Sequence, residues 1–256
     1  MPLFDPGYEV VPPSGVRIEL LGTFLVRIDG QILELPAGGR RLVAYLALSD
    51  RPLTRRVVAG ALWPASAGAR ALATLRTTLY RLNLRRSIVR SVEERLAFLP
   101  GTSCDVDEAM RWADRVIGGR AGTDDLAAEP PVSHELLAGW DDDWVLLERE
   151  RLRQRLLHGT EALVGELSAV GRHADAVAVA LAAVVVDPLR ESAHRAVIAA
   201  HLAEGNTADA VRQYRRFSSV LQSELGLAPT EGLQRFVQQG VRRGSAPIAV
   251  SGAVRG

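Results

Sequence analysis

Residues 70–86 read Arg-Ala-Leu-Ala-Thr-Leu-Arg-Thr-Thr-Leu-Tyr-Arg-Leu-Asn-Leu-Arg-Arg, and this stretch decides the fold of the first part of the chain. Leucines at positions 72, 75, 79 and 82 recur at spacings of three and four residues, so they share one face of a helix. Threonines and arginines dominate the other side. The pattern predicts an amphipathic helix that buries its leucines and presents a polar, basic face to its surroundings.

The flanking segments predict the rest of a small domain. Alternating apolar residues ahead of the helix predict three short strands, over about 16–20, 24–28 and 32–35. Two shorter helices follow these strands, over about 40–49 and 54–63. Thr54 caps the second of them, and Glu93-Glu94 connects two apolar runs beyond residue 86 into a terminal hairpin. Three strands, three helices and a hairpin are typical of a winged helix-turn-helix with an N-terminal sheet.

The polar face of the third predicted helix suits the major groove of DNA. Arginine donates two hydrogen bonds to guanine, and threonine offers a methyl group to thymine or a hydroxyl group to phosphate. Arginines at the rim would hold backbone phosphates, and Arg90 and Arg95 of the hairpin would enter the neighbouring minor groove or contact its phosphates. The candidate contacts on the helix are Arg70, Thr74, Arg76, Thr77, Thr78, Tyr80, Arg81, Arg85 and Arg86. A merely solvated arginine face is the competing interpretation.

The charge of the chain is divided unevenly between its two parts. Residues 15–100 contain 14 arginines and 6 acidic residues, a net charge of +8. Residues 101–256 contain 17 arginines and 22 acidic residues, a net charge of −5. This asymmetry indicates that the first part meets a polyanion.

Beyond residue 100 the sequence is helical nearly throughout and contains one internal repeat. Pro100–Ser103 is the predicted hinge between the two parts. Gly171 and the segment Ala174–Val177 recur 34 residues later as Gly205 and Ala208–Val211, which is the period of tetratricopeptide helix pairs. The sequence therefore predicts a mainly α protein with a winged-helix domain and an all-α, tetratricopeptide-like repeat domain. The expected divisions are a flexible arm (1–14), the winged helix (15–100), the helical domain (101–244) and a flexible tail (245–256).

The composition excludes several chemistries. The chain contains no lysine, so it has neither a Walker A loop nor a Schiff-base lysine for pyridoxal phosphate. One cysteine, Cys104, excludes an intramolecular disulfide and a multi-cysteine zinc site. We recognise no catalytic constellation and expect no enzymatic activity and no cofactor. The longest uncharged apolar run, Ala176–Val186, is too short to span a bilayer, and the first residues lack a signal-peptide pattern, so we expect a soluble, cytoplasmic protein.

Four features of the second part permit a site but suit a structural role better. Asp141–Asp143 permit a metal site, yet they precede a long predicted helix whose free N–H groups carboxylates would cap. His194 and His201 permit a metal pair, but packed or exposed histidines are the commoner case. The cluster Tyr214–Phe217 is interpreted as a helix surface with one buried aromatic residue, with a polymerase or DNA contact as the alternative. Cys104 is interpreted as a small packed residue.

Several motifs of this chain resemble the Streptomyces antibiotic regulatory protein (SARP) family. Four motifs of the first part are similar to that family's OmpR-type winged helix: Leu21–Phe24, Arg51–Thr54, Ala61–Pro64 and Leu75–Leu82. Four motifs of the second part resemble its bacterial transcriptional activator domain: Gly139–Leu152, Pro188–Arg195, Ala210–Tyr214 and Leu225–Thr230. The resemblance covers residues 16 to about 242, in the order of the family.

The resemblance implies an activator of secondary-metabolite (antibiotic) gene clusters. Such a protein binds direct repeats in double-stranded promoter DNA near the −35 region and contacts RNA polymerase holoenzyme, including its sigma factor. Transferred by position, Thr77, Thr78 and Arg81 would face bases. Thr74, Tyr80 and Trp63 would lie against phosphates. Direct repeats need two winged-helix domains (heads) arranged head to tail, so the second domain would supply homodimer contacts, polymerase contacts or both.

Two other functions remain open at this stage. The chain could be a peptide-binding scaffold of repeat helices whose winged helix has lost its affinity for DNA. It could also be a ligand-sensing repressor with a pocket in the helical domain. Arg76 and Arg81 on the outer face of the third helix argue against the scaffold.

Overall fold

The computed structural model describes residues 15–49, 51–85 and 87–244, which form two compact units. The described residues up to Met110 and the segment His134–Leu152 form the first unit, and Arg111–Ser133 and the residues from Arg153 onward form the second. The division falls within two helices, α4 (Asp105–Ile117) and α6 (Asp143–Ala169). The predicted arm (1–14), the predicted tail (245–256) and Arg86 lie outside the described residues.

A sheet of four strands, in the order β3-β2-β1-β7, opens the first unit. β1 (Val16–Glu19) pairs antiparallel with β2 (Leu25–Ile28), as the alternation of apolar residues predicts. β2 pairs with β3 (Gln31–Ile32), which overlaps the third predicted strand, over 32–35, only at Ile32. β7 (Thr102–Cys104) pairs in parallel with β1. The prediction of a hinge at Pro100–Ser103 is therefore wrong, because half of that segment belongs to the sheet. Its strand partner lies more than 80 residues earlier, too distant for local pattern to reveal.

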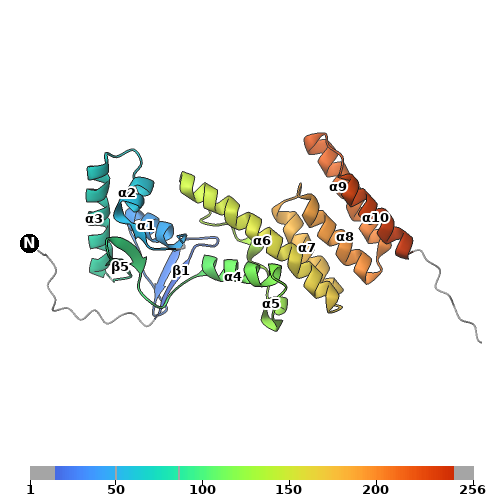
Figure 1. The fold of residues 1–256 in the computed structure, drawn as a ribbon, viewed down its shortest axis with the longest axis horizontal. Helices are drawn as coiled ribbons and strands as arrows, with labels where there is room; N and C mark the ends of the chain where they lie inside the picture. The colour runs from blue at the N-terminus through green and yellow to red at the C-terminus, as the bar shows by residue number, and fades with distance from the viewer. Residues whose placement is uncertain (1–14, 50, 86, 245–256) are drawn as a thin grey trace, which may run out of the picture. The chain divides into compact units, whose positions relative to one another are not determined.

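Three helices follow the first hairpin: α1 (Ala37–Ala47), α2 (Arg55–Leu62) and α3 (Gly68–Arg85) (Figure 1). Thr54 caps α2 as predicted, since its hydroxyl oxygen accepts a hydrogen bond from the backbone N–H of Val57 at 3.4 Å. Ser49 was expected on the face of α1 but lies beyond the helix end, where its hydroxyl donates to the Tyr45 carbonyl at 2.8 Å.

The buried face of α3 is shifted slightly from the predicted leucine stripe. Leu75, Leu79 and Leu82 are buried as expected. Leu72 is only half-buried, and Ala71 takes the fourth buried position. Successive helical residues are about 100° apart, so exchanging residue 72 for residue 71 rotates the buried face by about 20° around the helix without changing its width.

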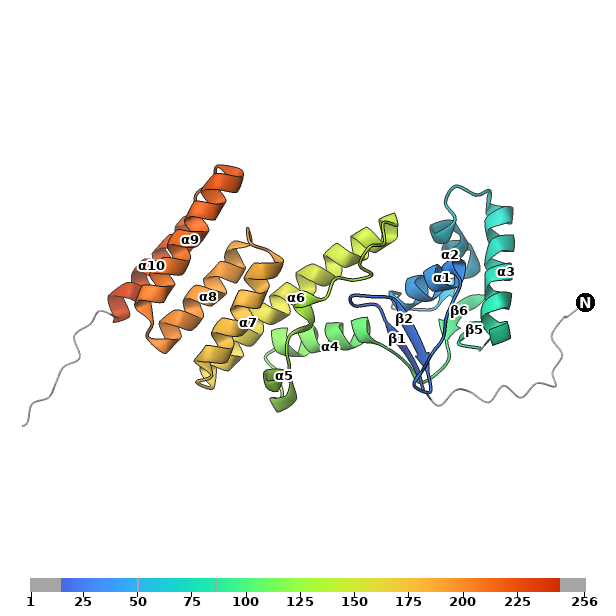
Figure 2. The ribbon, with the colours of Figure 1, turned by 180° about the vertical axis from the view of Figure 1, so that it is seen from behind.

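The terminal hairpin belongs to a second, three-stranded sheet. Its strands are β5 (Val89–Val92) and β6 (Arg95–Phe98), and β4 (Leu53–Thr54) pairs with β6 on the side away from β5. Glu93 and Glu94 connect the hairpin with φ values of +49° and +62°, as a two-residue turn with both residues left-handed requires. Figure 2 shows β5 and β6 beside α3. The predicted winged helix-turn-helix is thus confirmed, with β4 as an unpredicted strand.

The segment His134–Leu152 packs on the first unit although it follows α4 in sequence. Leu136 forms a β-bridge with Leu21, and the backbone N–H of Leu137 donates to the Leu20 carbonyl at 2.8 Å. The ring of Trp140 stacks on Phe24 with 5.8 Å between centroids, and the guanidinium of Arg40 lies over both rings. The first compact unit therefore extends past residue 100. The division into functional domains at residue 100 stays a prediction.

Helices make up most of the second unit, beginning with the end of α4. The remaining elements are α5 (Thr123–Ala127), a 3-10 turn (Pro131–Ser133), the later part of α6, α7 (His173–Val186), α8 (Glu191–Glu204), α9 (Thr207–Leu225) and α10 (Glu231–Gly244). α8 packs against α7, α9 and α10 (Figures 1 and 2). None of the helices in the described residues is long and apolar enough to cross a membrane.

The 34-residue repeat corresponds to two equivalent helix connections, from α6 to α7 and from α8 to α9. Gly171 and Gly205 adopt positive φ values of +77° and +86° between helices, a conformation that favours glycine. Ala176 and Ala210, five residues after each glycine, are fully buried. Small side chains there let neighbouring helices pack closely, so the structure confirms the tetratricopeptide-like domain.

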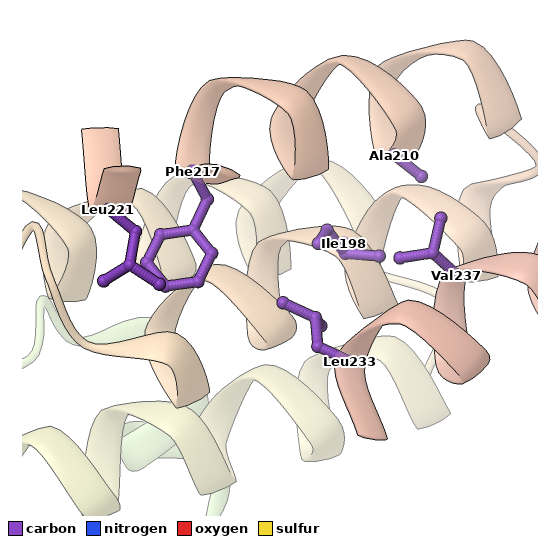
Figure 3. Close-up of a cluster of buried hydrophobic side chains, with 6 residues drawn as sticks. All are labelled: Ile198, Ala210, Phe217, Leu221, Leu233 and Val237. Atoms are coloured by element: carbon purple, nitrogen blue, oxygen red, sulfur yellow. The ribbon is translucent and has the colours of Figure 1, made fainter. Parts of the chain in front are cut away.

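A hydrophobic cluster joins α8, α9 and α10, with Phe217 and Leu221 side by side at one end (Figure 3). The ring of His194 stacks on Phe217 with 4.2 Å between centroids. His194 Nε2 lies 2.9 Å from the Pro188 carbonyl oxygen, and Nδ1 lies 2.9 Å from the side-chain nitrogen of Gln213. Burial lowers the pKa of His194, so a neutral ring that donates to Pro188 and accepts from Gln213 satisfies both nitrogens. The packed-histidine interpretation is confirmed.

Cys104 and the aspartates before α6, which permitted a site in the sequence, also have structural roles. Cys104 is buried in β7, and burial raises the pKa of its thiol to about 12. Asp142 was expected to cap α6, but its carboxylate forms an ion pair with Arg41 instead. Within residues 15–49, 51–85 and 87–244, no group of three or more histidine, cysteine or acidic side chains is arranged to hold a metal ion.

Candidate nucleic-acid interface

The outer face of α3 presents a continuous stripe of exposed side chains opposite its buried leucines. Ala73, Thr77, Tyr80 and Arg81 are exposed, and Tyr80 keeps 65% of its surface accessible. At about 100° per residue these positions point away from Leu75 and Leu82. A helix with this arrangement is anchored on one side and can enter a groove of DNA with the other.

The threonines of α3 are not equally available to a ligand. The hydroxyls of Thr74, Thr77 and Thr78 donate to the carbonyls four residues earlier, at 3.0, 3.2 and 2.9 Å. Each hydroxyl proton is thus used within the helix, so the oxygen lone pairs and the methyl group remain for contacts. Thr77 is exposed and offers both.

Thr78, a predicted base contact, lies on the side of α3 that faces α1. It is half-buried, and a Cβ atom added at Gly38 would lie only 3.5 Å from its hydroxyl oxygen. Thr74 is also half-buried, on the same side of the stripe as Thr78. Trp63 is half-buried at the C-terminal end of α2, where its backbone N–H donates to the Ala59 carbonyl at 3.0 Å.

The arginines around the outer face carry uncompensated charge. Arg70, Arg76 and Arg81 of α3 and Arg90 and Arg95 of the hairpin are exposed. Within the described part of the chain none of these five forms an ion pair. Arg95 only donates to the Pro52 carbonyl, at 3.3 Å. The face is therefore electropositive, as a surface that meets phosphates should be.

Several other arginines of the same unit are paired. Arg17 binds Glu108 at 2.9 Å, Arg27 binds Glu19 at 3.2 Å, and Arg41 binds Asp142. Arg85 ends α3, but its side chain, like the whole of Arg86, lies outside the described residues.

Two basic residues of this surface, Arg55 and Arg56, were not predicted as candidates. They occupy the first turn of α2 and, like the five arginines above, form no ion pair within the described residues. Together with α3 and the hairpin they border a hollow of about 480 Å³. Its lining residues are Arg55, Arg56, Leu72, Leu75, Arg76, Ser91 and Glu94. The sequence signal was two consecutive arginines directly after the Thr54 cap.

Comparison with known proteins gives a domain match for the second part of the chain. Residues 133–241 match the model of the bacterial transcriptional activator domain. The match includes the segment that begins at Gly139, which the sequence motifs identified as the opening of that domain.

Two curated relatives are regulatory proteins named AfsR. The chain is 27% identical to AfsR of Streptomyces coelicolor over 263 aligned positions, which cover 97% of this chain and 26% of the relative. It is also 27% identical to AfsR of Streptomyces griseus over 242 positions, which cover 90% of this chain and 25% of the relative. The chain spans about a quarter of the length of these relatives.

A solved structure shares the fold. Mycobacterium tuberculosis EmbR, determined in complex with a low-affinity phosphopeptide, aligns with a TM-score of 0.68 at 21% identity, covering 89% of this chain and 65% of EmbR. The matched domain model, the two relatives and the common fold agree with the motifs in the sequence. Residues 133–241 of this chain thus match the bacterial transcriptional activator domain, and the chain as a whole is similar to part of two Streptomyces regulatory proteins.

Proposed function

We propose that the chain binds promoter DNA through the outer face of α3 and activates transcription. The observation that carries this proposal is the exposed stripe of Thr77, Tyr80 and Arg81 on an 18-residue helix, bordered by arginines without ion pairs in the described residues. Arg81 can donate two hydrogen bonds to guanine, and the methyl group and lone pairs of Thr77 suit thymine or a base amino group. Arg70, Arg76, Arg90 and Arg95 would hold phosphates.

The site we propose is a direct repeat near the −35 region. Two heads bound head to tail would read it, and the helical second domain would supply dimer contacts, polymerase contacts or both. In this proposal RNA polymerase holoenzyme, including its sigma factor, is recruited to a weak promoter in the cytoplasm. The match to the bacterial transcriptional activator domain and the similarity to two Streptomyces regulatory proteins support a secondary-metabolite gene cluster as the target.

Run-off transcription with purified RNA polymerase holoenzyme tests the activating role. The template carries a promoter that the protein binds, and the control template carries the same promoter with the site scrambled. We expect the full chain to increase transcript from the first template only. A decrease in transcript on the intact site would instead identify a repressor, and an identical yield from both templates would contradict recruitment.

A further inference from the structure

The hollow between α2, α3 and the hairpin has the composition of an anion site. Three arginines border it, Arg55 and Arg56 of α2 and Arg76 of α3, together with Ser91. Leu72 and Leu75 form part of its lining and are apolar. Its volume of about 480 Å³ falls within the range of ligand pockets, about 300–1,000 Å³.

The position of the hollow indicates which anion it takes. Arg76 lies one helical turn before Tyr80, about 40° away around α3, so the hollow borders the outer face and a DNA strand that follows this face passes it. Arg55 and Arg56 lie in the first turn of α2, where the positive end of the helix dipole also attracts negative charge. A backbone phosphate with its sugar would place the charge among the arginines and the sugar against the apolar lining.

Glu94 is the one acidic residue of the lining. It is held there by the left-handed turn of the hairpin, and its carbonyl oxygen accepts a bond from the backbone N–H of Arg55 at 3.4 Å. Its carboxylate brings negative charge into a site that suits an anion. Glu93 occupies the same turn, is exposed as well, and does not line the hollow.

We propose that Arg55, Arg56 and Arg76 form a cradle for one backbone phosphate of DNA, and that Glu94 weakens this contact by like-charge repulsion. The inference rests on the DNA-binding function proposed above. Within it, Glu94 sets how tightly the head holds any duplex, because a phosphate contact carries no sequence information. The hairpin turn thus lowers non-specific affinity and leaves the choice of sequence to the outer face of α3.

Binding titrations of the full chain test the cradle on two duplexes of equal length, a selected site and a scrambled sequence. We expect Arg56→Ala to reduce the slope of log affinity against log salt by about 0.9 on both duplexes. The affinity ratio of wild type to this variant should then shrink about 3.5-fold between 50 and 200 mM salt. Arg111→Ala removes the same charge from an exposed position of α4 and should leave the slope unchanged.

The matched pair Glu94→Gln and Glu93→Gln tests the repulsion. Both variants remove one negative charge from the same turn, but only Glu94→Gln should strongly increase the affinity for both duplexes. The increase should be largest at low salt, where screening is weakest. Equal effects of the two glutamate variants, together with equal slopes for Arg56→Ala and Arg111→Ala, would overturn the cradle while DNA binding stands. Failure of the wild type to bind either duplex would overturn the proposed function and the cradle together.

Discussion

Replacing Arg81 with alanine separates base reading from general attraction to DNA. Arg81 is exposed on the outer face of α3 and has no ion pair within the described residues, so its loss removes no internal contact. Alanine also favours the helix, and the folded head should remain as stable as the wild type. The effect on binding therefore reports on DNA alone.

The magnitude follows from the contact that we assign to this side chain. A bidentate arginine–guanine contact contributes about 1–3 kcal/mol of discrimination, so Arg81→Ala should weaken binding to the selected site about 5- to 160-fold. Binding to a scrambled duplex should change far less, and one base pair of the site should lose its preference. Fluorescence anisotropy with single-base variants of the site measures all three quantities.

Arg70→Ala is the matched control, because Arg70 is an exposed arginine of the same helix to which we assign a phosphate. Arg70→Ala should weaken binding to all duplexes alike and lower the slope of log affinity against log salt by about 0.9. Unchanged affinity of Arg81→Ala, or a loss of equal size on the selected and scrambled duplexes, would refute base reading by Arg81.

The second unit gives three predictions about stability. Phe217→Ala should lower the free energy of unfolding by about 3–5 kcal/mol in denaturant titrations, because the ring is fully buried in the cluster of Figure 3; a loss below about 1 kcal/mol would contradict that packing. Because burial holds the pKa of His194 below its ordinary value of 6.5, the unfolded chain binds this proton more readily than the folded one. Stability should be complete above about pH 6.5 and decline as the pH falls below it, and His194→Gln should remove this part of the slope; equal slopes for variant and wild type would exclude His194 as the cause. Gly159→Ala should lower the free energy of unfolding by about 1–3 kcal/mol, because the added Cβ would lie 2.8 Å from the Trp112 ring. Gly165→Ala, in the same helix but facing open space, should raise it by about 0.4–1 kcal/mol. Stabilisation by both substitutions would show that α4 and α6 pack less closely at Gly159.

Local features of this fold were predictable from the sequence because their causes lie within a few residues. The leucine spacing of α3 specifies a helix, Thr54 caps α2 through the N–H three residues later, and Gly171 and Gly205 mark helix ends through their left-handed backbone. The outer stripe of Thr77 and Arg81 follows directly from the same periodicity. Each of these needs only the geometry of one turn of helix.

Features that depend on distant partners were not predictable in the same way. Thr102–Cys104 becomes a strand only because β1, more than 80 residues earlier, offers a free edge. Likewise, Trp140 packs on Phe24 and Arg40 across about 100 residues of sequence. The hollow draws its arginines from two helices, and Glu94 reaches it from the hairpin. Periodicity places each residue on a face but does not say which faces meet.

Selection of fragmented genomic DNA by the purified full chain, at near-physiological salt and followed by sequencing, tests DNA reading by α3 most directly. We expect the wild type to enrich a promoter-proximal direct repeat near −35, and Arg81→Ala to lose that enrichment while still retaining DNA non-specifically. Recovery of nothing above background by a protein shown to be folded would contradict promoter binding and favour a scaffold of repeat helices.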